Sequence, residues 1–231
     1  MPTRSNETLG MFVRHPVAGR VKTRLAAELG GPRACAIYAA FLSDLIARFQ
    51  RTGTRRFLCF TPDDCESRRY FEELAGNNYG LWTQPDGDLG IRMQRFFDEH
   101  LNVADDRAVV IGSDSPTLPQ EYLDRAFAEL GRDELTRADC VVGPATDGGY
   151  YLIGMQGRVW PIFSGITWSD HRVLDQTISR LVDTGGQLAL LPVWYDVDTP
   201  DDLQMLAGHV RALEACGSTI NLDATRRCLG P

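Results

Sequence analysis

The chain has 231 residues, of which 43% are hydrophobic and 24% are charged, and its formal net charge is −7. This composition excludes an intrinsically disordered protein, because the apolar content is sufficient to bury a core. No apolar run approaches the roughly 18 residues that span a bilayer, and the N-terminal segment lacks the apolar region of a signal peptide. We therefore expect a cytoplasmic globular protein, with a single domain over residues 1–231 and a core at about 9–215.

Positive charge is concentrated near the beginning of the chain. Residues 1–60 contain ten Arg or Lys and three Asp or Glu, whereas the remaining 171 residues contain 14 and 28. An acidic protein is a poor general binder of nucleic acids, while a basic segment facing acidic loops suits a small polyanion and a divalent cation. Of the 24 basic residues, 23 are Arg, and Lys22 is the single lysine. Six cysteines without a C-x-x-C pair and four histidines without ligand-like spacing argue against a zinc site.

Apolar patterns predict that strands and helices alternate along the chain. Strands are expected at 8–13, 56–60, 79–83, 107–112, 139–145, 150–154 and 188–194, and helices at 22–29, 32–51, 65–75, 89–101, from about 119, at 171–184 and at 199–214. Thr117 and Gln120 have the spacing of a capping box at the helix near 119. This order predicts an α/β fold with a mostly parallel sheet and helices on both faces, in which the hairpin at 146–149 adds an antiparallel strand.

In such sheets, ligands bind beyond the carboxyl ends of the strands, so the loops that follow strands are the candidate site. The first such loop is R-H-P-V-A-G-R-V-K-T-R-L, residues 14–25. Its cations and its glycine are suited to binding phosphates, and the candidate residues are Arg14, Gly19, Arg20, Lys22 and Arg24. A solvated basic turn before a helix is the alternative. If Lys22 binds phosphate, Lys22→Met should weaken nucleotide binding with little loss of fold stability.

Two acidic loops supply candidate metal ligands. Asp114, in S-D-S-P, directly follows an apolar strand, where a hard cation that bridges phosphates would need an oxygen ligand. Asp196 and Asp198, in Y-D-V-D-T-P-D-D-L, lie on the loop that leaves another strand, and both are candidates for a second metal ligand. An Asx turn at Asp114 and helix capping at 195–203 are the alternative interpretations.

Two further segments have weaker signals. Asp147, Gly148, Gly149 and Tyr150, in A-T-D-G-G-Y-Y, form either a substrate-binding turn or an ordinary hairpin. Trp168 could contact a sugar or base, although isolated aromatic residues are more often part of a core.

The segment Q-P-D-G-D-L-G-I-R-M, residues 84–93, adds two candidates for nucleotide binding. Asp88 is also a good N-cap residue, so helix capping explains much of its pattern. Arg92 is the charged residue that this structural interpretation leaves unexplained.

Four motifs in order, R-x-P-x-x-G-R-V-K-T-R-L, G-S-D-S-P, G-P-A-T-D-G-G-Y-Y-L-I-G and D-V-D-T-P-D-D-L, resemble a bacterial family of radical-SAM/selenodomain-associated glycosyltransferases. The resemblance runs from about Leu9 to Leu206. It implies the nucleotide-diphospho-sugar transferase superfamily, with a three-layer αβα, Rossmann-like GT-A fold. Molybdenum-cofactor and phospholactate guanylyltransferases are similar relatives, and the second has a comparable K-T-R-L loop.

The resemblance also implies roles for individual residues. The loop from Arg14 to Arg24 would bind the phosphates of a nucleotide, and Asp114 and Asp198 would hold Mg²⁺ or Mn²⁺. Here Asp114 stands in S-D-S rather than in D-x-D. Asp147 and Tyr150 would contact substrate, and we include Lys22, Asp114 and Asp147 among the catalytic candidates.

The expected function is transfer of a sugar from a nucleotide-diphospho-sugar to an unknown small acceptor. The alternative is a nucleotidyltransferase that joins a nucleoside triphosphate to a phosphorylated small molecule. A non-catalytic nucleotide-binding module is the third possibility. The expected partners are small molecules, with no nucleic acid and no membrane, and the sequence leaves the oligomeric state open.

Overall fold

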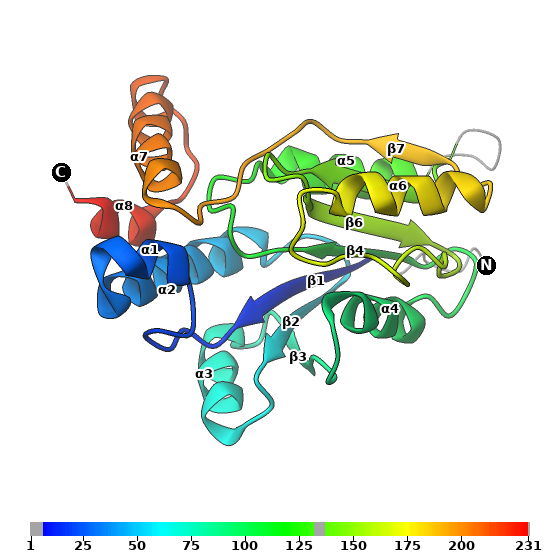
Figure 1. The fold of residues 1–231 in the computed structure, drawn as a ribbon, viewed down its shortest axis with the longest axis horizontal. Coiled ribbons are helices and arrows are strands. Elements are labelled where there is room, and N and C mark those ends of the chain that lie inside the picture. Colours follow the sequence, from blue (N-terminus) through cyan, green and yellow to red (C-terminus); the bar gives the residue numbers. More distant parts are fainter. Residues whose placement is uncertain (1–6, 132–136, 231) are drawn as a thin grey trace.

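The structure, a computed structural model, describes residues 7–131 and 137–230 (Figure 1). Its strands are β1 (Glu7–Arg14), β2 (Arg55–Thr61), β3 (Gly80–Thr83), β4 (Arg107–Ile111), β5 (Cys140–Pro144), β6 (Tyr150–Gln156) and β7 (Leu188–Leu190). Its helices are α1 (Thr23–Leu29), α2 (Gly31–Phe49), α3 (Cys65–Ala75), α4 (Leu89–His100), α5 (Gln120–Leu130), α6 (Val173–Asp183), α7 (Pro200–Ala215) and α8 (Asp223–Leu229).

The strands form one seven-stranded sheet in the order β3-β2-β1-β4-β6-β5-β7. Every pairing is parallel except those of β6 with β4 and β5. The predicted mixed, mostly parallel sheet is therefore confirmed, including the antiparallel strand after the hairpin. Because β1, β4, β5 and β7 run in one direction, the loops that follow them emerge at the same edge of the sheet.

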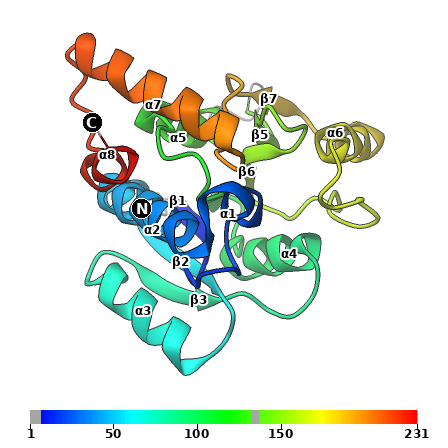
Figure 2. The ribbon, with the colours of Figure 1, turned by 60° about the vertical axis from the view of Figure 1, so that its left-hand side comes forward.

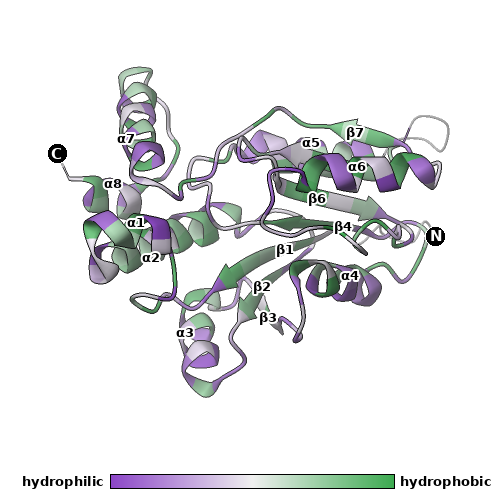
Figure 3. Ribbon diagram, in the orientation of Figure 1, coloured by the Kyte–Doolittle hydropathy of each residue, from purple (hydrophilic) through white to green (hydrophobic). Residues whose placement is uncertain are grey.

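Helices cover both faces of the sheet, which confirms the three-layer αβα arrangement. One hydrophobic cluster joins a face of the sheet to α2, α3 and α5, and a second joins the opposite face to α4 and α6. The strands are hydrophobic along most of their length, whereas the helices alternate between hydrophobic and hydrophilic residues (Figure 3). A third cluster joins α2, α7 and α8 at one end of the sheet (Figure 2). Among the described residues, no helix is both long and apolar enough to cross a membrane.

Local sequence determines where several helices begin. Asp88 caps α4 by accepting a hydrogen bond from the Ile91 N–H at 2.9 Å. Thr199 and Asp202 form a reciprocal capping box at the start of α7, directly before Pro200. Both starts agree with the sequence.

The predicted capping box at Thr117 and Gln120 is wrong. Pro119 is the N-cap of α5, and no side chain caps this helix. Thr117 is buried and its Oγ1 donates to Tyr195 Oη at 2.8 Å. The helix begins two residues later than a cap at Thr117 requires, so that hydroxyl is available for a tertiary contact.

Two other elements differ from the sequence prediction. The last strand ends at Leu190 instead of 194, because Pro192 cannot donate a ladder hydrogen bond. Trp194 rejoins the sheet only through an isolated bridge to Ala145. Helix α8, which the sequence did not predict, is docked by Asp44 of α2, whose carboxylate accepts the N–H groups of Ala224 and Thr225 at 3.0 and 2.7 Å.

We predict that Asp44→Ala will detach α8 from α2. Hydrogen bonds to a charged acceptor contribute about 1.5–3 kcal/mol each, so loss of both should lower the free energy of unfolding by at least about 3 kcal/mol. Hydrogen exchange of the α8 amides should become markedly faster, while Asp44→Asn, which keeps one acceptor, should lose less. Unchanged exchange in α8 would show that this carboxylate does not anchor the helix.

Candidate active site

A cavity of about 540 Å³ lies where the loops after β4, β5 and β7 meet the first turn of α1. Its lining combines several carboxylates with two aromatic rings and one arginine. The lining residues are Arg24, Leu89, Asp114, Asp147, Gly149, Tyr150, Trp168, Ser169, Asp170, His171, Val173, Asp196 and Asp198. The four loops that the sequence singled out by their polar residues therefore do meet at one edge of the sheet.

Lys22 joins two of these loops beneath the cavity. Its Nζ lies 2.5 Å from Asp114 Oδ1 and 2.8 Å from Asp198 Oδ1, and it donates to the carbonyl oxygen of Val197 at 2.7 Å. The Lys22 side chain is 3% exposed, whereas those of Asp114 and Asp198 are 43% and 40% exposed. All three ammonium donors thus have acceptors within the protein, and the carboxylates remain open to the cavity.

Electrostatics keep Lys22 charged in this position. Burial alone would lower its pKa, but the nearby charges of Asp114 and Asp198 outweigh burial, so the pKa lies above its ordinary value. The rings of Tyr38 and Phe41 lie 5.7 and 5.9 Å from Nζ. Lys22 also has a left-handed backbone, with φ 47°, which is uncommon for a residue other than glycine. The loop adopts this conformation at the point where its single ammonium enters the interior.

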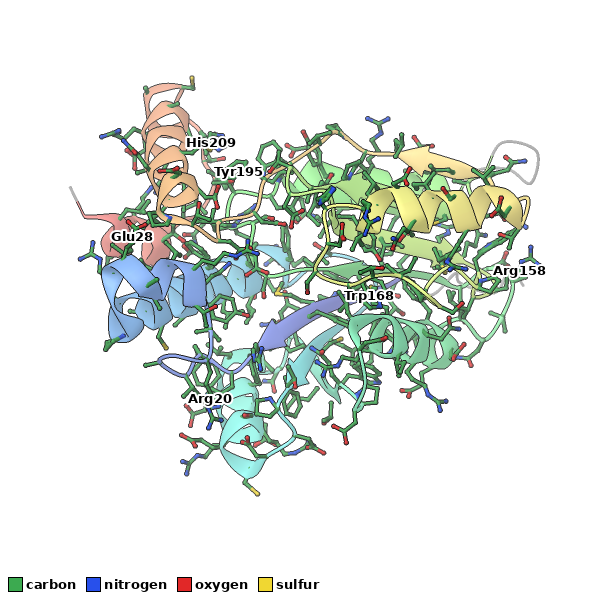
Figure 4. The ribbon with its side chains drawn as sticks, in the orientation of Figure 1. Arg20, Glu28, Arg158, Trp168, Tyr195 and His209 are labelled. Carbon is green, nitrogen blue, oxygen red and sulfur yellow. The ribbon has the colours of Figure 1, made fainter. Side chains whose placement is uncertain are left out.

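The loop after β4 is fastened to the segment before α7 by further hydrogen bonds. Ser115 Oγ donates to Asp196 Oδ1, and the Val197 N–H donates to the Asp114 carbonyl oxygen at 2.9 Å. A third bond joins Thr117 to Tyr195. Residues 114–117 are thus bonded to residues 195–197 at three successive points. Figure 4 shows Tyr195 on the coil segment that leads into α7, near His209. The two acidic loops therefore form one unit.

Asp196 is the most perturbed carboxyl group at the site. Burial, together with the charges of Asp114, Asp147 and Asp198, raises its pKa to about 7, although the hydrogen bond from Ser115 opposes the shift. The raised pKa shows that several carboxylates lie close together at this end of the cavity.

Trp168 forms a wall of the cavity and rests on α4. A Cβ at Gly90 would lie 2.7 Å from Phe163 O and 2.7 Å from Trp168 Cζ2, so only glycine permits this close approach. Figure 4 places Trp168 between α4 and α6. The glycine at this helix start therefore sets the position of an aromatic ring at the site.

The hairpin between β5 and β6 also lines the cavity. Gly148 has φ 91°, and a Cβ there would lie 2.0 Å from the carbonyl oxygen of His171. Its own carbonyl oxygen accepts the Leu174 N–H at 2.9 Å. Asp147 is exposed, and its Oδ1 accepts the Gly149 N–H at 2.9 Å. The hairpin is thus fixed against the start of α6.

The structure brings most, but not all, of the predicted site residues together. Those at the cavity are Arg24, Asp114, Asp147, Gly149, Tyr150, Trp168 and Asp198, with Lys22 beneath it and Gly148 behind the hairpin. Arg14 is the exposed last residue of β1, Gly19 and Arg20 lie on the exposed loop after it, and none of the three lines this cavity. Figure 4 places Arg20 near α3, well apart from Trp168.

Asp88 and Arg92 also lie outside the cavity. Asp88 caps α4. Arg92 donates to Gly87 O at 3.1 Å and to Gln84 Oε1 at 3.2 Å. These contacts give both residues a structural role, and a direct part in nucleotide binding stays a prediction.

Sequence reasoning missed the segment that closes the cavity, where Ser169, Asp170 and His171 line the wall. Asp170 pairs with Arg172 at 2.8 Å. The sequence S-D-H directly after Trp168 contains polar residues that could have indicated a site. It does not directly follow a strand, however, so it was not expected at the carboxyl edge of the sheet. Tyr38 was also missed: its hydroxyl contacts Ser113 Oγ at 2.8 Å and accepts the Arg14 N–H at 3.1 Å, which ties α2 to the ends of β1 and β4.

A family comparison identifies the family of this chain. The model of the family described as "Uncharacterized protein conserved in bacteria (DUF2064)" matches residues 45–170, more than half of the chain. The chain belongs to this family. No curated protein matches the sequence.

Solved structures identify the fold. A crystal structure described as a "putative nucleotide-diphospho-sugar transferase" from Desulfovibrio desulfuricans G20 is 30% identical, with a TM-score of 0.81, over 91% of this chain and 96% of that chain. An inositol-1-phosphate CTP transferase from T. maritima is 15% identical, with a TM-score of 0.57, over 94% and 99%. A CMP:2-keto-3-deoxy-manno-octonic acid synthetase complexed with CTP is 13% identical, with a TM-score of 0.53, over 92% and 100%. This chain therefore has the nucleotide-diphospho-sugar transferase fold that its four sequence motifs implied.

The burial of Lys22 changes the expectation for Lys22→Met. Removal of the ammonium leaves two close carboxylates without their shared cation, so the free energy of unfolding should fall by about 2–3 kcal/mol, somewhat less than for a fully buried pair. Denaturant titration measures this loss. Added Mg²⁺ should restore more stability to Lys22→Met than to the unsubstituted protein, and equal stability of the two proteins without metal would contradict the bridging role.

Gly90→Ala should displace Trp168 from the cavity wall. The added methyl group meets a backbone oxygen and the indole ring, and overpacking of this kind costs about 1–3 kcal/mol. Gly208→Ala in α7 is the matched control, because no atom lies within 4 Å of its added Cβ and alanine is the better helix former. Denaturant titration should show a loss at Gly90 and none at Gly208. A neutral effect of Gly90→Ala would mean that the ring is not held by this contact.

Proposed function

We propose that this protein is a metal-dependent transferase that moves a sugar from a nucleotide-diphospho-sugar to a small acceptor. The observation that supports this most strongly is the pair of carboxylates, Asp114 and Asp198, which Lys22 holds together at the carboxyl edge of the sheet and which open onto a cavity. The D. desulfuricans protein, which is 30% identical, is described as a nucleotide-diphospho-sugar transferase, and this also supports the proposal.

Asp114 and Asp198 fit a divalent cation such as Mg²⁺ or Mn²⁺. Their ion pairs with Lys22 use Oδ1 of each carboxylate, which leaves the second oxygen of each for a hard cation. Among the described residues, no group of three or more His, Cys, Asp or Glu side chains is arranged to hold a metal. Oxygens of the bound nucleotide would therefore complete the coordination. The cation would offset the charge that develops on the departing diphosphate.

The remaining side chains have separate tasks in this proposal. Arg24 lies at the cavity and would contact the phosphates, with Arg14 and Arg20 of the same loop nearby in sequence. Tyr150 and Trp168 offer ring faces for the sugar. Asp147 would accept the proton of the acceptor hydroxyl during attack on the anomeric carbon.

Nucleotidyl transfer is the second candidate. The segment from Arg14 to Arg24 carries three arginines, of which Arg24 lines the cavity, and none of the three forms an ion pair within the described residues. Such a segment suits the developing charge of pyrophosphate. In that reaction a phosphorylated acceptor would attack the α-phosphorus of a nucleoside triphosphate.

We predict that the purified protein releases a nucleoside diphosphate from at least one of UDP-glucose, GDP-mannose and ADP-glucose in the presence of Mg²⁺ or Mn²⁺. Asp114→Asn should lower this rate at least about 100-fold, because a bound cation supplies several kcal/mol of charge stabilisation. It should also weaken metal binding, measured by calorimetry with UDP present. Asp183→Asn, an exposed residue at the far end of α6, is the control and should behave as the unsubstituted protein does.

The products distinguish the two candidates. Release of pyrophosphate from a triphosphate and a sugar phosphate, with no turnover of any nucleotide sugar, would overturn glycosyl transfer in favour of nucleotidyl transfer. Unchanged metal affinity in Asp114→Asn would remove this residue from the metal site.

A further inference from the structure

The charges around the cavity define the class of acceptor. We propose that the acceptor is a hydroxyl-bearing small molecule with a protonated amine, and that it has neither a phosphate nor a carboxylate at the end that enters the cavity. This inference rests on the proposed glycosyl transfer and adds the substrate class to it.

Negative charge dominates the cavity wall. Five carboxyl groups line it: Asp114, Asp147, Asp170, Asp196 and Asp198. Burial and the neighbouring charges raise the pKa of Asp196 to about 7, so the other four carry most of the negative charge. The permanent cations are Arg24 in the lining, Lys22 beneath it and Arg172, which pairs with Asp170. His171 also lines the cavity, with its Nδ1 3.3 Å from Asp170 Oδ1. An anionic acceptor would have to approach this surface against repulsion, which is costly inside a concave site of low dielectric.

Most of these carboxylates already have partners or have a task on the donor side. Asp114 and Asp198 share Lys22, and Asp170 pairs with Arg172 at 2.8 Å. A nucleoside diphosphate and its cation would occupy the side of Asp114, Asp198 and Arg24. The charges of that group would then be close to balanced, so they give no attraction to a second anion.

Asp147 is the exposed carboxylate of the five, whereas the other four are half-buried. Its Oδ1 accepts only the Gly149 N–H, and it forms no ion pair with any residue in the described ranges 7–131 and 137–230. Asp196 also forms no ion pair among the described residues, but it accepts a hydrogen bond from Ser115 Oγ, and burial raises its pKa to about 7. The hairpin that bears Asp147 is fixed by the contact of Gly148 with His171. A rigid carboxylate at the cavity wall is a ready partner for a cationic group, because little ordering is required when the ion pair forms.

The apolar part of the wall fits the rest of such an acceptor. Tyr150, Trp168, Leu89 and Val173 line the same cavity as Asp147. Sugar-like rings and alkyl segments pack on aromatic faces, while an amine and hydroxyl groups bind at the carboxylate. The combination favours an amino sugar or an amino alcohol over a sugar phosphate.

The test compares three matched acceptors, glucosamine, glucose and glucose 6-phosphate, below neutral pH, where the amine is protonated. Acceptor-dependent release of diphosphate is measured with UDP-glucose, GDP-mannose or ADP-glucose and Mg²⁺. We expect kcat/KM to be about tenfold higher for glucosamine than for glucose, the effect of one charge-assisted contact, and lowest for glucose 6-phosphate.

Asp147→Asn tests the assigned residue. Because Asp147 also has a proposed role in proton transfer, the informative quantity is the ratio of glucosamine to glucose, in which a common loss of kcat cancels. That ratio should fall to about one in Asp147→Asn and stay near tenfold in Asp183→Asn. An unchanged ratio in Asp147→Asn would overturn the assignment, as would a preference of the unsubstituted protein for glucose 6-phosphate or equal use of the three acceptors.

A binding measurement separates this inference from the proposed function. Saturation-transfer NMR with UDP and Mg²⁺ present should show glucosamine bound more strongly than glucose, no binding of glucose 6-phosphate, and loss of the amine preference in Asp147→Asn. If no nucleotide sugar is turned over but this order of binding holds, the glycosyl transfer is wrong and the acceptor class stands. Turnover of a nucleotide sugar with the opposite order overturns the acceptor class alone.

Discussion

The ion pairs of Lys22 with Asp114 and Asp198 are the constraint on which the site depends. Without a cation between them, two carboxylates from separate strand ends would repel each other and separate. The buried ammonium keeps them together, and its third hydrogen bond, to Val197 O, fixes the loop before α7. A lysine is suited to this task because its compact charge can contact three acceptors at once, whereas the guanidinium of arginine is a planar fork.

The topology of the sheet explains why these residues meet. Strands β1, β4, β5 and β7 end at one edge, so the basic loop, both acidic loops and the hairpin converge there although they are far apart in the sequence. The convergence also divides charge within the cavity. The segment after β1 contributes the cationic side chains of Lys22 and Arg24, while the hairpin and the segment before α6 contribute carboxylates and aromatic rings. The donor and acceptor ends of a substrate complex would therefore have different electrostatic surroundings.

Much of this arrangement could be predicted from sequence, because strand ends and polar loops follow from local patterns. The mixed sheet and the location of Asp114, Asp147 and Asp198 at its carboxyl edge followed in this way. The ion-pair partners of Lys22 could not be predicted from sequence. Its contacts with Asp114 and Asp198 span 92 and 176 residues of sequence and depend on tertiary structure. For the same reason, Thr117 looked like a helix cap, although its hydroxyl instead bonds to Tyr195. Asp170 and His171 were missed because they follow no strand.

The most direct test of the central claim is a crystal structure of the protein with Mn²⁺ and UDP, with the metal located by anomalous scattering. We expect one strong anomalous peak in contact with the carboxylates of both Asp114 and Asp198, with the diphosphate on the same ion and close to Arg24. Crystals of Asp114→Asn grown in the same way should lack this peak. A peak elsewhere in the protein, or a diphosphate bound without contact to this edge of the sheet, would contradict the account.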